Sequence, residues 1–147
     1  MVVLCLYLSM STLAAQELKK PMITVTSEHT FAETVNRLKA QIEEKGLNLF
    51  AVIDHAAGAT KANLELSPNT LIIFGNPKVG TLLMQSDAQM GYELPLKFLV
   101  SENEQGQVLI SYRDPLSYKT TYRLEEKVQV LENVGKALAG ISGAAAR

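Results

Sequence analysis

The order of apolar and polar residues predicts a strand followed by a helix in the first third of the chain. From Met22 to Thr26, apolar and polar side chains alternate and several are β-branched, which is typical of a strand. From Phe31 to Lys45, apolar side chains recur every three or four residues, the spacing of one helix face. Thr30 and Glu33 have the spacing of a capping box, and Gly46 is a typical helix stop.

The middle of the chain predicts two more strands and a short helix. Leu47 to Ile53 is nearly all apolar, as in a buried strand, whereas residues 56–63 are small and polar and predict a loop or a short helix. Thr70 to Phe74 predicts a third strand. Asn76 and Pro77 suit the cap and the first residue of a helix that follows it.

The last third of the chain predicts a hairpin and an amphipathic helix. Pro95 to Ser101 and Gln107 to Tyr112 read as two strands joined by a polar link that contains a glycine. Residues 128–141 repeat apolar side chains at helical spacing, and residues 143–147 are expected to be a frayed tail. The predicted order is strand, helix, four strands and helix, with a small helix inserted after the third strand. Both long helices need the same sheet to cover their apolar faces.

Composition and charge limit the classes of function. The chain has 147 residues, of which 47% are hydrophobic and 20% charged, and this predicts one folded domain over residues 16–147. The net charge is −1 and no basic block occurs, so we expect neither nucleic-acid binding nor electrostatic attachment to lipid. The apolar run at the start is too short for a stable membrane span.

The first 15 residues are uncharged, and an apolar run is followed by small residues, which predicts a secretory signal over residues 1–15. The protein is therefore expected to be periplasmic or secreted. No basic residue precedes the apolar run, and the alternative is an ordered segment of a cytoplasmic protein. Cys5, the single cysteine, lies inside this segment. We expect no cofactor, and with two histidines at unpaired spacing we expect no metal site.

Two segments carry candidate chemistry. Asp54-His55 follows the second strand, and an imidazole near a carboxylate can act as a base, although adjacent strand residues point to opposite faces. Gly75 to Thr81 joins a strand to a helix start, where free amides favour anions, and Lys78 and Thr81 would hold a carboxylate or phosphate. The alternative is a tight turn in which Gly80 has a positive φ or lets two backbones approach closely.

A third group of polar residues lies near strand ends and would line a pocket with His55 if the sheet brings them together. Its members are Glu93, Tyr112 and Asp114. The sequence lacks the patterns of a serine hydrolase, a dinucleotide site and a phosphate loop, since no lysine follows Gly80.

Three segments, taken in order, resemble the domain-of-unknown-function 302 family: 52–55, 71–81 and 94–97. The resemblance covers about residues 22–141, and it is most specific at F-G-N-P-x-x-G-T. Glu93 stands where the family commonly has an aspartate. The resemblance implies an α+β fold like that of the TATA-binding protein, β-α-β4-α, with a curved antiparallel sheet covered by helices. It also implies a tendency to form homodimers. In addition it favours one shared surface made of His55, Gly75, Asn76, Pro77, Gly80 and Thr81.

Three functions follow as hypotheses. The first is a binding module for a small anionic ligand. The second is an enzyme with His55 as general base and Asp54 or Glu93 as its acidic partner. The third is a homodimeric structural protein whose last helix presents small residues to a second copy. The candidate ligand-binding residues are His55, Asn76, Lys78, Gly80, Thr81 and Glu93.

Overall fold

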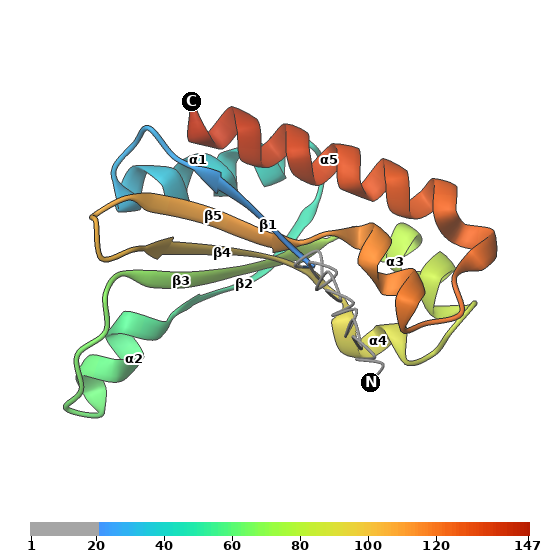
Figure 1. The fold of residues 1–147 in the computed structure, drawn as a ribbon, viewed down its shortest axis with the longest axis horizontal. Helices are drawn as coiled ribbons and strands as arrows, with labels where there is room; N and C mark the ends of the chain where they lie inside the picture. The colour runs from blue at the N-terminus through green and yellow to red at the C-terminus, as the bar shows by residue number, and fades with distance from the viewer. Residues whose placement is uncertain (1–20) are drawn as a thin grey trace, which may run out of the picture.

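The computed structural model describes residues 21–147 and shows one antiparallel sheet of five strands with helices packed on one face (Figure 1). The predicted secretory signal lies outside the described residues. The strands are β1 (Met22–Thr26), β2 (Asn48–Asp54), β3 (Asn69–Gly75), β4 (Leu96–Glu102) and β5 (Val108–Arg113). The helices are α1 (Phe31–Glu44), α2 (His55–Lys61), α3 (Pro77–Met84), α4 (Met90–Glu93) and α5 (Val128–Ala146), with 3-10 helices η1 (Pro115–Thr120) and η2 (Glu125–Lys127).

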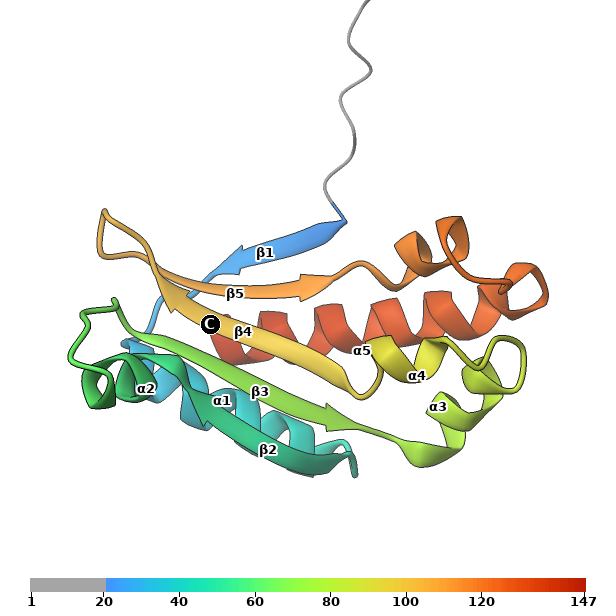
Figure 2. The same ribbon diagram turned by 90° about the horizontal axis from the view of Figure 1, so that it is seen from below.

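The sheet has the order β1-β5-β4-β3-β2, so the first two strands of the chain form its opposite edges (Figure 2). β4 and β5 form the predicted hairpin, and the side-chain oxygen of Asn103 accepts the backbone N–H of Gln105 and of Gln107 in its turn. Gly106 has a φ of +73°, a conformation that favours glycine. The predicted α+β fold with a curved sheet and an inserted helix is confirmed.

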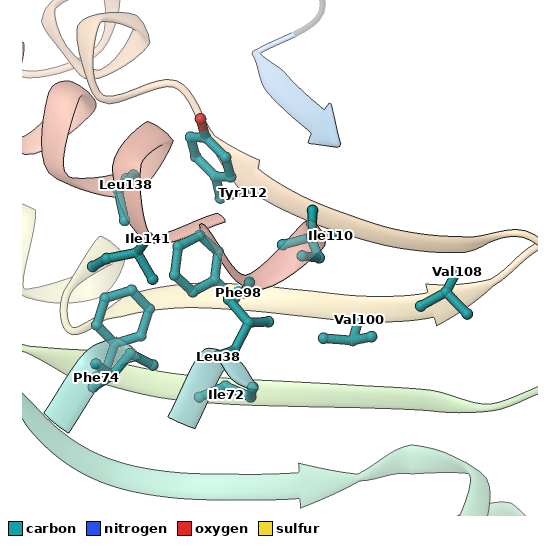
Figure 3. Close-up of a cluster of buried hydrophobic side chains, with 13 residues drawn as sticks. Leu38, Ile72, Phe74, Phe98, Val100, Val108, Ile110, Tyr112, Leu138 and Ile141 are labelled. Atoms are coloured by element: carbon teal, nitrogen blue, oxygen red, sulfur yellow. The ribbon is translucent and has the colours of Figure 1, made fainter. Parts of the chain in front are cut away.

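The core lies between the sheet and the two long helices, α1 and α5 (Figure 3). Every second residue of the central strands is fully buried, and Phe74 and Phe98 stack with their ring centroids 4.8 Å apart. Leu38 of α1 and Ile141 of α5 pack on these rings. The two helices therefore share one apolar face of the sheet, as their periodicity predicts.

The start and end of α1 follow the sequence signals with one difference. The hydroxyl of Thr30 accepts the N–H of Glu33 at 3.4 Å, which is half of the predicted capping box. The Glu33 carboxylate contacts the His29 ring nitrogen at 3.2 Å, and no bond from it back to the Thr30 amide is formed. At the other end, Gly46 has a φ of +66°, and the N–H of Leu47 donates to the carbonyl of Ile42 at 3.1 Å. This is the glycine stop that the sequence predicts.

The expected frayed tail is instead the last turn of α5. Ala145 and Ala146 are buried in the core, so helix continuation removes apolar surface from water. The Arg37 side chain donates hydrogen bonds to the carbonyls of Ala144, Ala145 and Arg147. A cation at a helix C-terminus satisfies free carbonyls and complements the helix dipole. A contact between residues that are far apart in the sequence therefore fixes the C-terminal end of the chain.

Among residues 21–147, no helix has the length and the apolar character needed to cross a membrane.

Candidate functional site

A cleft of about 560 Å³ lies between α3, α5 and the ends of β3 and β4. Phe74, Gly75 and Leu96 contribute from the sheet, and Val79, Leu82 and Leu83 contribute from α3. Opposite them, α5 presents a row of apolar side chains spaced by three and four residues. The row is Val130, Leu131, Val134, Ala137, Leu138 and Ile141.

The cleft exists because the segment from Gly75 to Gly80 turns sharply from β3 into α3. The side-chain oxygen of Asn76 accepts the N–H of Lys78 at 3.0 Å, and Pro77 occupies the first helical position. The N–H of Gly80 then donates to the Asn76 carbonyl at 3.0 Å and starts the helical ladder. The predicted cap at Asn76 and the predicted first residue at Pro77 are both confirmed.

Gly80 lines the cleft from inside α3. Its φ lies outside the left-handed region, and the atoms nearest to a Cβ there belong to side chains, so neither predicted reason for a glycine, a positive φ or a close approach of two backbones, applies. A Cβ at this position would lie 3.5 Å from a methyl carbon of Leu94 and 4.0 Å from the Met84 methyl carbon, which are ordinary contacts. The glycine therefore leaves space at the cleft wall, and no backbone strain requires it.

A bulge in β2 places Phe50 on the cleft. The pairing of β2 with β3 shifts by one residue between Leu49 and Ala51, and Phe50 is the extra residue. Its side chain is 53% exposed and lies beside Gly75, where a Cβ would be 3.8 Å from the ring. Bulges redirect a side chain that would otherwise follow the alternation of the strand. The sequence carries no signal for this bulge, since Leu47 to Ile53 reads as one regular buried strand.

Charge is nearly absent from this cleft. None of the described residues that line it carries a charged side chain, and the polar side-chain atoms belong to Asn76, Asn133 and Tyr118. Lys78 and Thr81, which the sequence suggests as anion ligands, are exposed and lie outside the lining. Of the six candidate residues, only Asn76 and Gly80 line the cleft.

His55 lies at the other end of the sheet. Asp54 pairs with Thr70 at the start of β3, whereas Asn48 pairs with Gly75 at its end. These pairs are five residues apart along β3, which is about 16 Å in a strand. Figure 1 shows α2 and α3 at opposite ends of the molecule. The expected single surface that joins His55 to residues 76–81 is therefore not formed.

The acidic neighbours of His55 are engaged elsewhere. The Asp54 carboxylate caps α2 and accepts the N–H of Ala57 at 2.9 Å. His55 itself is the first residue of this helix and is exposed, and among the described residues its ring forms no hydrogen bond or ion pair. Glu93 lies in a separate cluster near the cleft. The geometry thus lacks the acidic partner that the general-base hypothesis requires.

Glu93 is the centre of a half-buried polar cluster behind one wall of the cleft. One of its carboxylate oxygens accepts the hydroxyl of Tyr122 at 2.8 Å and the guanidinium of Arg113 at 3.0 Å. The Arg113 guanidinium lies 4.8 Å from the centre of the Tyr118 ring, and Tyr118 lines the cleft. The backbone carbonyl of Glu93 accepts the ammonium group of Lys97 at 2.7 Å. Glu93 therefore supports the cleft wall through Arg113 and Tyr118.

The environment shifts the pKa of three neighbours of Glu93. Burial, with the nearby Glu93 charge, raises the pKa of Tyr118 to about 12. The hydrogen bond to Glu93 raises the pKa of Tyr122 above its usual value, whereas burial lowers the pKa of Lys97. Both tyrosines are therefore neutral hydrogen-bonding groups near neutral pH.

Tyr112 and Asp114, the other two polar residues near strand ends, make contacts within the fold. Tyr112 is buried in the core with its ring 5.4 Å from that of Phe98, and the planes are perpendicular. The Asp114 carboxylate caps η1 and accepts the N–H of Leu116 at 3.0 Å. Neither lines the cleft. Within residues 21–147, no three His, Cys, Asp or Glu side chains are grouped so that they could hold a metal ion.

Comparisons with known proteins relate this geometry to a family. The model of the family described as domain of unknown function DUF302 matches residues 23–141. A crystal structure of a DUF302 protein from Bacillus stearothermophilus superimposes with a TM-score of 0.75 at 19% identity, and the match covers 87% of this chain and 99% of that chain. At this identity the likeness concerns the fold alone.

Two curated relatives are similar over part of their length. A fluoride-specific ion channel, FluC 1, of Brucella suis biovar 1 (strain 1330) is 45% identical over 94 residues, which is 64% of this chain and 37% of the relative. FluC 1 of Brucella abortus biovar 1 (strain 9-941) has the same identity over 94 residues and is covered to 35%. The chain thus spans about a third of the length of these curated relatives.

Proposed function

Since this chain belongs to the DUF302 family, with a family match over residues 23–141, we propose that it is a binding protein whose cleft takes a small apolar molecule. The observation that carries the proposal is the cleft itself. Its volume of about 560 Å³ lies within the range of small-molecule sites, and its lining is almost entirely apolar. The family-specific segment from Gly75 to Gly80 forms one of its walls.

The physical argument is that a ligand would remove apolar surface from water here. Phe50 and Leu82, on the cleft, are 53% and 43% exposed, whereas side chains of this type are usually buried. Each square ångström of apolar surface that a ligand covers contributes about 25 cal/mol. This replaces the expectation of a small anion held by Lys78 and Thr81, because both residues lie outside the cleft.

The test uses N-phenyl-1-naphthylamine, an uncharged probe that fluoresces in apolar surroundings. Ala137 lines the cleft but is exposed, so Ala137→Trp fills the site without disturbing the core. Ala139 is exposed on the same helix outside the lining, and Ala139→Trp is the matched control. We expect saturable fluorescence in the parent and in Ala139→Trp, and its loss in Ala137→Trp. Equal binding by both variants would place the probe elsewhere and refute the proposal.

We propose that the protein works outside the cytoplasm, on the basis of the uncharged apolar start and the small residues of positions 1–15. The check is cell fractionation of the full-length chain with a C-terminal tag, together with the N-terminal sequence of the product. A processed protein in the periplasm or medium supports the proposal. An unprocessed protein in the cytosol would contradict it.

We also propose that the open face of the sheet mediates homodimer formation. Antiparallel sheets that face water usually carry polar residues outward. By register, however, Ile53, Leu71 and Leu99 lie side by side, and they alternate with the core residues, so they belong to the face away from the long helices. Leu99→Lys should yield a monomer in size-exclusion chromatography with light scattering, whereas Ala139→Lys, on the exposed side of α5, should remain a dimer. The reverse result would assign the contact to α5, and a monomeric parent would reject the dimer.

A further inference from the structure

The shape of the cleft indicates the class of its ligand, an inference that rests on the proposed function. We propose that the ligand is a single-chain amphiphile, such as a fatty acid, whose alkyl chain lies along α5 and whose polar head is at the exposed rim. Two observations carry this: the elongated apolar row on α5, and the two asparagine side chains that lie at the rim.

The cleft lining on α5 extends from Val130 to Ile141, which corresponds to about 16 Å along a helix. An alkyl chain is much thinner than a helix, whose diameter is about 10 Å, and it can lie along this row with α5 on one side and α3 and the sheet on the other. Taking about 30 Å³ for each water-sized group, a volume of about 560 Å³ holds on the order of 15–20 non-hydrogen atoms.

The polar atoms at the rim favour a head group that accepts hydrogen bonds. Asn76 and Asn133 line the cleft and are exposed. The side-chain oxygen of Asn76 accepts the Lys78 amide at 3.0 Å, and that of Asn133 accepts the Gln129 side chain at 3.3 Å. Their amide nitrogens therefore remain as donors toward a carboxylate or an ester. The rest of the lining offers an alkyl chain an almost entirely apolar surface.

The experiment measures displacement of N-phenyl-1-naphthylamine by octanoate, decanoate and dodecanoate, each below its micellar concentration. If the chain lies in the cleft, each added methylene should tighten binding by up to about fourfold. Ala137→Trp should weaken all three acids, and Ala139→Trp should leave them unchanged. Equal affinity of octanoate and dodecanoate, in a parent whose cleft still binds the probe, would overturn the inference and leave the proposed function standing. A probe that is insensitive to Ala137→Trp refutes the proposed function itself.

A second variant tests the position of the head group. Asn133→Leu removes one rim donor on the exposed side of α5, and we expect dodecanoate to bind about fivefold more weakly, the loss of one hydrogen bond. The uncharged probe has no head group to accept this hydrogen bond, so its affinity should fall less than that of dodecanoate, and the ratio of the two affinities reports the head-group contact. If Asn133→Leu and Asn76→Ala both bind dodecanoate like the parent, the head does not lie at this rim and the assigned orientation is wrong.

Discussion

Gly80→Ala is expected to raise the free energy of unfolding by about 0.5–1 kcal/mol, which is the usual gain when alanine replaces glycine inside a helix. Gly80 is the fourth residue of α3, and its N–H already donates to the Asn76 carbonyl. The added methyl would contact Leu94 at 3.5 Å and Met84 at 4.0 Å, both ordinary distances. The backbone is outside the left-handed region, so nothing in its conformation opposes a side chain.

The chain offers a matched control. Gly58 is the fourth residue of α2, whose cap is Asp54, and a Cβ there meets no atom within 4 Å. Gly58→Ala therefore reports helix propensity alone, and the difference between the two variants reports the contact of the new methyl with Leu94 and Met84. Urea unfolding followed by circular dichroism measures both. For a chain of this size, the expected gain corresponds to a rise in Tm of about 1–4 °C.

The two explanations of Gly80 predict changes of opposite sign in the free energy of unfolding. If Gly80 were required for a strained turn, the alanine would cost about 1–3 kcal/mol, while Gly58→Ala would still stabilise. Such a pair of results would refute the reasoning from the helix geometry. Reduced binding of the naphthylamine probe by the stabilised Gly80→Ala protein would in addition show that this glycine keeps the cleft open.

Three further predictions concern polar contacts. Arg37→Met should lower the free energy of unfolding by about 1–2 kcal/mol in urea titration, because the last carbonyls of α5 lose their donors. The Asp87 carboxylate accepts backbone N–H groups, which lower its pKa. The ionised carboxylate therefore stabilises the folded state fully above its ordinary pKa of about 4, and this contribution is lost as the pH falls through the lowered pKa of the folded protein. Asp87→Asn should thus lower Tm near neutral pH and match the parent in strong acid. Glu93→Gln should lower the pKa of Tyr122 toward 10 in alkaline absorbance titration; an unchanged titration would contradict the assigned hydrogen bond.

Local signals predict the sheet and its helices well. Gly46 ends α1 as expected, Asn76 and Pro77 begin α3, and the hairpin at Gly106 joins β4 to β5. Each of these signals acts within a few residues, where backbone geometry and capping dominate. α4 and the 3-10 helices are missed, because helices of three to six residues carry too few periodic positions to be detected.

The candidate site is harder to predict because it depends on which end of a strand each residue occupies. His55 and Asn76 both follow apolar strands, and nothing in their local sequence separates them. Because β2 and β3 are antiparallel, their C-terminal ends lie at opposite ends of the sheet, and the two residues that follow these strands are therefore far apart. Glu93 lies near the cleft, but its partners Arg113 and Tyr122 are 20 and 29 residues away in sequence. Only the folded chain reveals that contact.

One wall of the cleft is formed by the apolar face of α5, which the periodicity predicts to be covered by the sheet. Leu131, Leu138 and Ile141 are buried, while Val134 and Ala137, one or two turns away on the same stripe of α5, are partly or fully exposed. Helical periodicity records which residues share a face but not whether a neighbour covers that face. α1 packs near the C-terminal end of α5, where Arg37 contacts the last carbonyls, whereas α3 faces another part of α5 across the cleft. An apolar stripe that extends past the end of its covering helix is therefore the sequence-level trace of an open cleft, and it is recognised only when the position of that partner helix is known.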